Sequence, residues 1–177
     1  MAKGASFAPK ASRRRDRRPP SHLSNAQANL DAEVPVFDAL GKTLGVVFEQ
    51  KATIVLGGEK VKPDGVDADR TVFVEVFTRL GKMKPGQRHK VSTDVLKLLA
   101  IREVHPGARL ILAFVDDEAA ASVSGWRAAT LAANGIEIHT VQLDPAERAK
   151  IEAAKAGQKK GMAGSLALAA IGNGLRA

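Results

Sequence analysis

The most informative segment of the chain is Lys60-Val-Lys-Pro-Asp-Gly-Val-Asp-Ala-Asp-Arg-Thr-Val-Phe-Val-Glu-Val-Phe-Thr78. Its pattern predicts two antiparallel strands joined by a polar turn, with the first strand ending in Pro63-Asp64-Gly65. The second strand, over 71–78, is rich in the β-branched and aromatic residues that favour extended backbone. Between the strands, Asp67 and Asp69 are expected to belong to a solvated turn.

A single carboxylate lies within the apolar second strand. Because side chains alternate along a strand, Glu75 shares its face with Phe73 and Phe77. A carboxylate in such surroundings costs free energy unless a metal ion, a basic side chain or hydrogen-bond donors pair with it. Asp64 lies across the hairpin, where it is near enough to share one cation with Glu75.

Composition limits the classes of protein to consider. The chain has 177 residues, 45% of them apolar and 26% charged, which suits one globular domain with tails. We expect the domain over 26–156, a disordered basic arm over 1–25 and a Gly- and Ala-rich tail over 157–177. The absence of cysteine excludes disulfides, thiolate zinc sites and thiol nucleophiles, and suits a cytoplasmic protein. No apolar run approaches the roughly 18 residues of a membrane span, so no membrane partner is expected.

The net charge is concentrated at the start of the chain. Residues 1–20 contain seven basic residues and one acid, so they hold six of the eight net positive charges. Such an arm can bind the phosphates of a nucleic acid without sequence preference, or it can serve only as a solubilising tail. The residues predicted to bind nucleic acid here are Arg13, Arg14, Arg15, Arg17 and Arg18.

Hydrophobic periodicity predicts an α/β fold with helices on both faces of a mixed sheet. The helices joining the later strands are crossovers, which place those strands parallel or mixed in one sheet. Trp126 is expected in the core. The predicted elements are a helix over 24–42 with a break near Pro35, a short element over 43–49, a strand over 53–56, a tight turn at Gly57-Gly58, a returning strand over 59–66, a strand over 71–78, a helix over 87–104, a strand over 109–115, a helix over 116–133, a strand over 136–143 and a helix over 144–156.

The element order αβββαβ is similar to that of a known superfamily. Pro63-Asp64, ten intervening residues and then Glu75-Val76-Phe77 resemble the motif of the PD-(D/E)XK nucleases, which have the restriction-endonuclease-like fold. The resemblance covers roughly residues 27–143. It implies that Asp64 and Glu75 hold Mg²⁺, which accepts hard oxygen ligands and few protein carboxylates.

The chain departs from the superfamily pattern at one position. A lysine two residues after the second acid helps to position or activate the attacking water in that superfamily, and Phe77 stands there instead. Either the lysine function has moved to another residue or the site has lost its activity. The resemblance favours Lys90 as the displaced lysine, with Lys82 and Lys84 in the preceding loop as the other candidates. It also brings Gln87 on the helix to the site. Glu49 or Glu59 is a possible third metal ligand.

The resulting hypothesis is a Mg²⁺-dependent nuclease that acts on DNA rather than RNA. One alternative is a catalytically inactive nucleic-acid-binding or regulatory protein of the same fold, and another is an interaction module whose arm binds an acidic partner. A homodimer is compatible with the resemblance, since many small nucleases cut two strands as paired subunits. The residues also allow a purely structural role, in which Asp64 forms an Asx-turn and Glu75 pairs with Lys90 or Arg79.

Overall fold

The computed structural model describes residues 21–153, with side chains from residue 32 onward. The arm that carries the predicted nucleic-acid-binding arginines, and the tail over 157–177, lie outside the described residues. The described chain forms α1 (Ser21–Leu44), β1 (Phe48–Gln50), β2 (Ile54–Leu56), β3 (Glu59–Val61), β4 (Gly65–Asp67), β5 (Val72–Phe77), α2 (Pro85–Val104), β6 (Arg109–Phe114), α3 (Asp117–Ala121), α4 (Trp126–Ala133) and β7 (Ile136–Thr140). Residues 145–153 are also helical.

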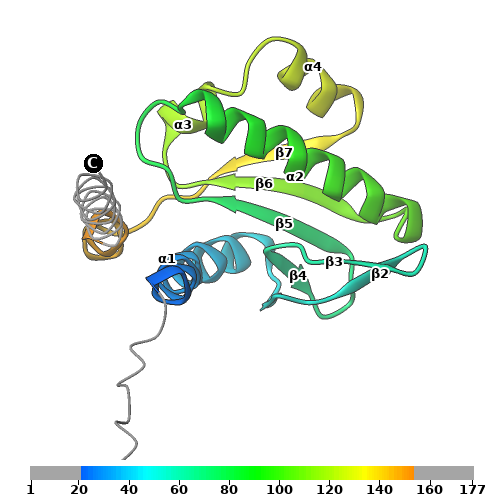
Figure 1. Ribbon diagram of the computed structural model, residues 1–177, viewed down its shortest axis with the longest axis horizontal. Helices are drawn as coiled ribbons and strands as arrows, with labels where there is room; N and C mark the ends of the chain where they lie inside the picture. Colours follow the sequence, from blue (N-terminus) through cyan, green and yellow to red (C-terminus); the bar gives the residue numbers. More distant parts are fainter. Residues whose placement is uncertain (1–20, 154–177) are drawn as a thin grey trace, which may run out of the picture.

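A five-stranded mixed sheet in the order β1-β4-β5-β6-β7 organises the fold (Figure 1). Strands β1, β4 and β5 are antiparallel neighbours, whereas β5, β6 and β7 run parallel. Strands β2 and β3 form a separate two-stranded hairpin. The prediction of an α/β fold with a mixed sheet flanked by helices is confirmed.

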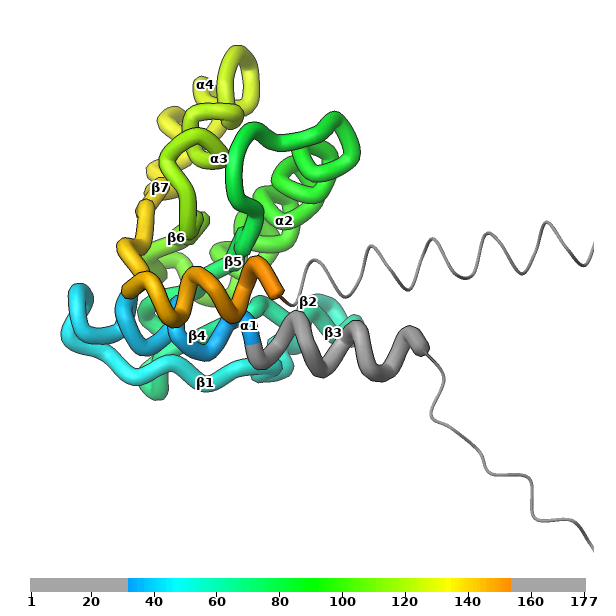
Figure 2. The backbone as a smooth tube through the Cα atoms, turned by 90° about the vertical axis from the view of Figure 1, so that its left-hand side faces the viewer, coloured from blue at the N-terminus to red at the C-terminus, as the bar shows by residue number. Residues whose placement is uncertain are grey.

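Helices cover both faces of the sheet. Figures 1 and 2 show α2, α3 and α4 on one face, and α1 with the 145–153 segment on the other. Strand β5 is buried at all six positions, and its side chains divide between the two layers as the alternation predicted. Phe73 and Phe77 pack in the layer of α2, whereas Val72, Val74 and Val76 pack against α1.

Helix α1 continues through Pro35, so the predicted break there is wrong. Its buried Val36 and Leu40 pack on the sheet, and this burial offsets the hydrogen bond that proline cannot donate. Gly65 on β4 allows the close approach of the helix. A Cβ atom at position 65 would lie 2.3 Å from the ring of Phe37 on α1.

The predicted strand over 59–66 is interrupted. Its first part, β3, pairs with β2, and its second part, β4, pairs with β5. Pro63-Asp64 therefore precedes the strand next to β5 instead of ending it. Asp67 is buried and is not solvated as expected, because it accepts hydrogen bonds from the N–H groups of Thr71 and Val72 and from the Thr71 hydroxyl.

The predicted helix over 116–133 consists of two short helices, α3 and α4, separated at Gly125, whose φ is 63°. The break turns Trp126 outward, so its side chain is 64% exposed and the expectation of a core residue is wrong. Strand β7 ends at Thr140, three residues before the predicted boundary. Within the described part of the chain, no helix combines the length and the apolar character needed to cross a membrane.

Candidate active site

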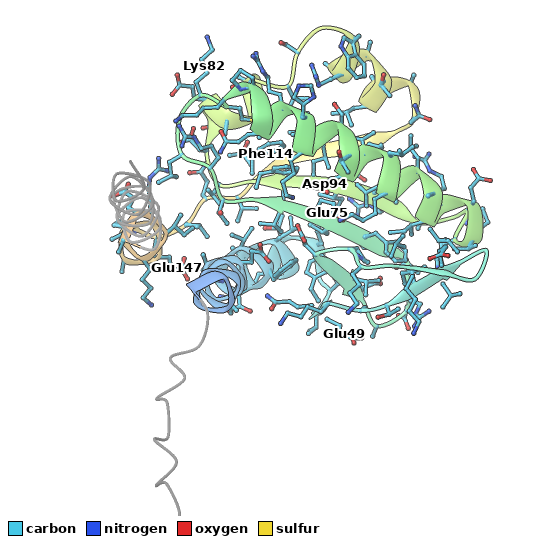
Figure 3. All side chains as sticks on the ribbon, viewed as in Figure 1. Glu49, Glu75, Lys82, Asp94, Phe114 and Glu147 are labelled. Atoms are coloured by element: carbon cyan, nitrogen blue, oxygen red, sulfur yellow. The ribbon has the colours of Figure 1, made fainter. Side chains whose placement is uncertain are left out.

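Asp64 and Glu75 come together where β4 begins beside β5. The antiparallel register pairs Gly65 with Val74 and Val66 with Phe73, and one further step sets Asp64 opposite Glu75. Asp64 is fixed there because its Oδ2 accepts a hydrogen bond from the backbone N–H of Val76 at 2.9 Å. Glu75 is fully buried, and Figure 3 shows it in the middle of the sheet beneath α2.

Lys97 on α2 is the direct partner of Glu75. Its Nζ lies 2.7 Å from both carboxylate oxygens, Oε1 and Oε2. Only the contact with Oε2 has hydrogen-bond geometry, so Oε1 has no hydrogen-bond partner among the described residues. The same Nζ donates to the backbone carbonyl of Lys62 at 3.3 Å, which joins α2 to the chain entering Asp64.

Lys90 belongs to the same cluster but contacts a different acid. Its Nζ pairs with the buried Asp94 at 2.5 Å and lies 4.6 Å from the ring centre of Phe77. Asp94 also lies 3.3 Å from Lys97. Residues 90, 94 and 97 share one face of α2, because side chains three and four positions apart are neighbours on a helix. The structure therefore assigns the contact with Glu75 to Lys97, and not to Lys90 or Arg79, the partners that the purely structural alternative named.

The site contains more carboxyl groups than the two lysines, Lys90 and Lys97, that pair with them. Burial raises the pKa of Glu75 to about 8, and the charges of Asp64 and Asp94 add to this effect against the opposing influence of Lys97. Glu33 on α1 joins the cluster: burial, followed by the charge of Asp64, raises its pKa to about 7. Two carboxyl groups with pKa values near neutrality mark a position that a cation would stabilise.

Lys97 remains protonated in these surroundings. Burial opposes its charge, but the hydrogen bond to Glu75 and the charges of Glu75, Asp94 and Asp64 outweigh burial and raise the Lys97 pKa. The ammonium group therefore acts as a fixed donor to the Glu75 carboxylate.

Several predicted site residues lie elsewhere. Glu49 is exposed on the edge strand β1, two strands from β5, and Figure 3 shows it far from Glu75. Gln87 accepts a hydrogen bond from the Lys84 N–H at 2.9 Å and so completes the start of α2. The loop lysines at 82 and 84 are exposed, and Figure 3 places Lys82 beyond the N-terminal end of α2. The exposed Glu59 belongs to the β2–β3 hairpin.

Three residues of the cluster, Glu33, Asp94 and Lys97, were missed by reasoning from the sequence. Glu33 precedes the buried Val36 and Phe37 by three and four residues, a spacing that places all three on the sheet-facing side of α1. Lys97 follows Lys90 by two helical turns. These spacings were the available signals, and the break expected at Pro35 hid the first of them.

The donor set fits a hard divalent cation held by few protein ligands. In the described part of the chain, no three acidic or histidine side chains converge closely enough to form a complete metal site. Mg²⁺ does not need such a group, because it retains several waters and commonly uses one or two carboxylates. Asp64 and Glu75 supply two, and Oε1 of Glu75, which contacts the Lys97 ammonium, accepts no hydrogen bond within the described chain.

The cluster of Glu33, Asp64, Glu75, Lys90, Asp94 and Lys97 is thus the strongest candidate for chemistry in the described chain. Comparisons with protein-family models, with curated proteins and with solved structures returned no match, so the geometry of this cluster carries the functional argument.

Proposed function

We propose that this chain is a metal-dependent nuclease that hydrolyses phosphodiester bonds of DNA, as a divergent member of the PD-(D/E)XK superfamily. The observation that carries the proposal is the position of Asp64 opposite Glu75, with the Lys97 ammonium 2.7 Å from the Glu75 carboxylate. The element order is further support, since α1, β1, β4, β5, α2 and β6 follow the αβββαβ pattern around one mixed sheet. In this proposal Lys97 supplies the lysine that Phe77 replaces.

Asp64 and Glu75 would hold Mg²⁺, with Glu33 beside them. A bound divalent ion supplies stabilisation of the charge that develops on the phosphate and lowers the pKa of water. The chain's own residues have separate tasks. Lys97 fixes the orientation of Glu75, while the N–H of Val76 fixes Asp64. Glu33, whose pKa burial and the charge of Asp64 raise to about 7 in the absence of a metal ion, is the candidate proton acceptor beside them.

The direct test is cleavage of plasmid and linear DNA by the full chain, with Mg²⁺ and with chelator. We expect Asp64→Asn, Glu75→Gln and Lys97→Met to abolish metal-dependent cleavage. Glu59→Gln, which changes an exposed acid on the neighbouring hairpin, is the matched control and should cleave at the unaltered rate. Cleavage that persists in chelator, or in the Glu75→Gln variant, would contradict the proposal.

A second candidate is a catalytically inactive DNA-binding protein on the same scaffold. The observation in its favour is that Lys97 already compensates the charge of the buried Glu75 without any metal. The two candidates differ in metal affinity. An inactive protein of this kind binds DNA with equal affinity with Mg²⁺ and with chelator, cleaves it under neither condition, and shows no stabilisation by divalent ions.

A further inference from the structure

Helix α2 presents a ridge of side chains away from the sheet. Its members, spaced alternately by four and three residues, are His89, Thr93, Leu96, Ala100 and Glu103. This alternation is the seam pattern by which two helices pack along their lengths. Leu96 lies at the centre and is 68% exposed, although it is a large apolar side chain.

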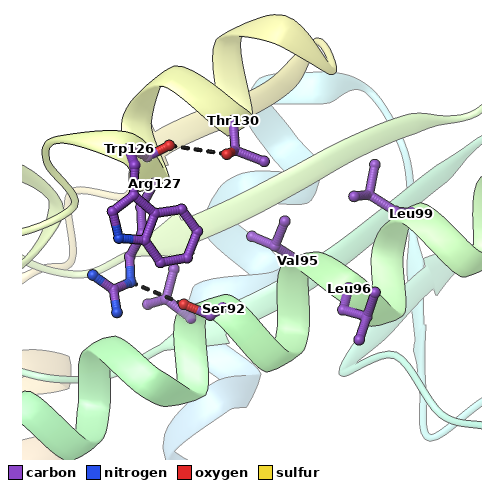
Figure 4. A pocket seen from close by; sticks show the side chains of 8 residues that line it. Ser92, Val95, Leu96, Leu99, Trp126, Arg127 and Thr130 are labelled. Atoms are coloured by element: carbon purple, nitrogen blue, oxygen red, sulfur yellow. Dashed lines mark hydrogen bonds between the residues drawn. The ribbon is translucent and has the colours of Figure 1, made fainter.

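An apolar groove runs beside the ridge, between α2 and α4 (Figure 4). It has a volume of about 280 Å³, and its walls include Leu96 and Leu99 from α2 and Trp126 from α4. Arg127 holds the α4 wall in place, because its Nε donates to the Ser92 hydroxyl at 2.9 Å and its guanidinium lies 4.6 Å from the Trp126 ring centre. The exposed Leu96 and Trp126 form a contiguous apolar surface, which is typical of a contact site.

We propose that this surface binds a second copy of the chain, through an antiparallel α2–α2 contact with a two-fold axis at Leu96. A two-fold contact requires a self-complementary surface. Antiparallel pairing about Leu96 sets Leu96 against Leu96, Thr93 against Ala100 and His89 against Glu103. The small residues on either side of the centre allow the helices to approach closely, and each Leu96 lies next to the groove of the other copy.

The charges at the two ends of the ridge favour the same arrangement. His89 and its neighbour Arg88 form a basic end, and Glu103 forms an acidic end. Glu103 is exposed, whereas the neighbouring Arg102 is half-buried, with its Nε and Nη2 out of contact with solvent. A parallel arrangement would place the two basic ends together and the two acidic ends together. The antiparallel arrangement instead places the basic end of each copy beside the acidic end of the other.

The contact does not involve the residues of the candidate active site. Asp94 and Lys97 point from α2 toward the sheet, away from the ridge, and contact Glu75 and Lys90 within the same chain. The inference therefore does not depend on the proposed nuclease activity. Either one can fail while the other stands.

The first measurement uses the full chain at a series of concentrations. Sedimentation should show a monomer–dimer equilibrium. Trp126 is the single tryptophan of the chain and there is no tyrosine, so its fluorescence reports on the groove alone. Its emission should shift to shorter wavelength as dimer forms and return on dilution. A monomer at every concentration overturns the proposal, and so does a short-wavelength emission that dilution leaves unchanged, since that result indicates that a segment of the same chain fills the groove.

Substitutions locate the contact. Leu96→Asp should raise the dimer Kd more than about tenfold, because a truncated or charged central residue removes a hot spot. Val55→Asp places the same charge at another exposed apolar position, 58% exposed on β2, and should leave the Kd unaltered. Both positions are on the surface, so a melting curve should confirm that each variant is folded. An unchanged Kd for Leu96→Asp, or an equal effect of Val55→Asp, overturns the proposal.

A charge exchange tests the antiparallel register. His89→Glu and Glu103→Lys should each raise the dimer Kd by about two- to tenfold, since every substitution acts twice across a two-fold axis. The double variant restores opposite charges and should return the Kd to within about twofold of the original. Additive weakening in the double variant would exclude the proposed pairing.

Discussion

Lys97 on α2 places its ammonium 2.7 Å from both oxygens of the Glu75 carboxylate on β5, and only one of the two contacts is a hydrogen bond. The helix thereby supplies the charge that compensates a buried carboxylate, although only Oε2 accepts a hydrogen bond from it. This relationship connects the stability of the fold to the proposed chemistry, because the same two groups serve both.

Removing Lys97 should show how much its contact with Glu75 contributes to the stability of the fold. Lys97→Met leaves Glu75 buried without its basic partner, and we expect the free energy of unfolding to fall by about 3–5 kcal/mol, as for a broken buried ion pair. Lys82→Met is the control. This lysine is exposed in the loop before α2, so the loss should stay below about 1 kcal/mol. Urea denaturation at pH 9, above the Glu75 pKa of about 8, measures both, and equal losses would show that Lys97 has no special role.

The pH dependence of stability should carry the signature of the raised carboxyl pKa values. The pKa values of Glu75 and Glu33 rise from 4.5 in the unfolded chain to about 8 and about 7 in the folded protein. Protonation therefore favours the folded state, and the stabilisation is complete below pH 4.5 and is lost as pH rises toward 8. Without divalent ions, the free energy of unfolding should decrease across this window.

The Glu75→Gln variant separates this contribution from other titrations. Its slope over the same window should be shallower by up to about 1.4 kcal/mol per pH unit, the value for one proton. Urea denaturation at half-unit pH steps, in chelator, provides the comparison. Parallel curves for the two proteins would mean that the Glu75 pKa is not raised.

Divalent ions should stabilise the unaltered chain. At Mg²⁺ concentrations about a hundredfold above Kd, binding to the folded state alone is worth about 2.7 kcal/mol, or roughly 5–10 °C in melting temperature for a domain of this size. Glu75→Gln and Asp64→Asn should melt at the same temperature with Mg²⁺ and with chelator. Stabilisation that survives both substitutions would place the ion elsewhere.

Asp67 should matter for stability and not for cleavage. Burial opposes its ionisation, but hydrogen bonds from Thr71 and from Val72 outweigh burial and lower its pKa below 3.8. The stabilisation that the ionised Asp67 provides is therefore present above pH 3.8. It is lost as the pH falls through the lower pKa that Asp67 has in the folded protein. Asp67→Ala should cost about 1–3 kcal/mol at pH 7 by leaving buried donors unpaired. A variant that is as stable as the parent chain would contradict this account.

The basic arm should supply affinity without sequence preference. Deleting residues 1–20 removes seven basic residues, so binding should weaken on every DNA sequence and the dependence of log K on log salt should flatten. A binding titration at several salt concentrations measures the slope. A slope that the deletion leaves unaltered would count against a nucleic-acid role for the arm.

The sequence predicted best those features that depend on a single strand or on two strands close together in the chain. Alternation along β5 fixed which side chains face which layer, and the spacing of Asp64 and Glu75 placed both acids correctly across the strand pair. Lys97 could not be chosen over Lys90 in the same way, because the sliding of a helix along a sheet depends on packing between distant segments. Trp126 was misplaced since the turn at Gly125 interrupts an apparently continuous helical pattern.

Glu33 was missed for a related reason. Propensity argues for a break at Pro35, yet burial of Val36 and Leu40 on the sheet holds the helix together through it. A local rule was overruled by tertiary packing, and the acid one turn before the buried residues was not considered as part of the site.

Gly65 affects the distance between Asp64, its neighbour in the chain, and Glu33 on α1. With a hydrogen in place of a methyl group, β4 accepts the Phe37 ring directly against its backbone, at a position where a Cβ would lie 2.3 Å from that ring. Any larger residue would lift α1 from the sheet and carry Glu33, one turn before Phe37, away from Asp64. Gly65 thus sets the spacing between Glu33 and Asp64. A larger residue at this position would change the pKa of Glu33 without altering any charged group.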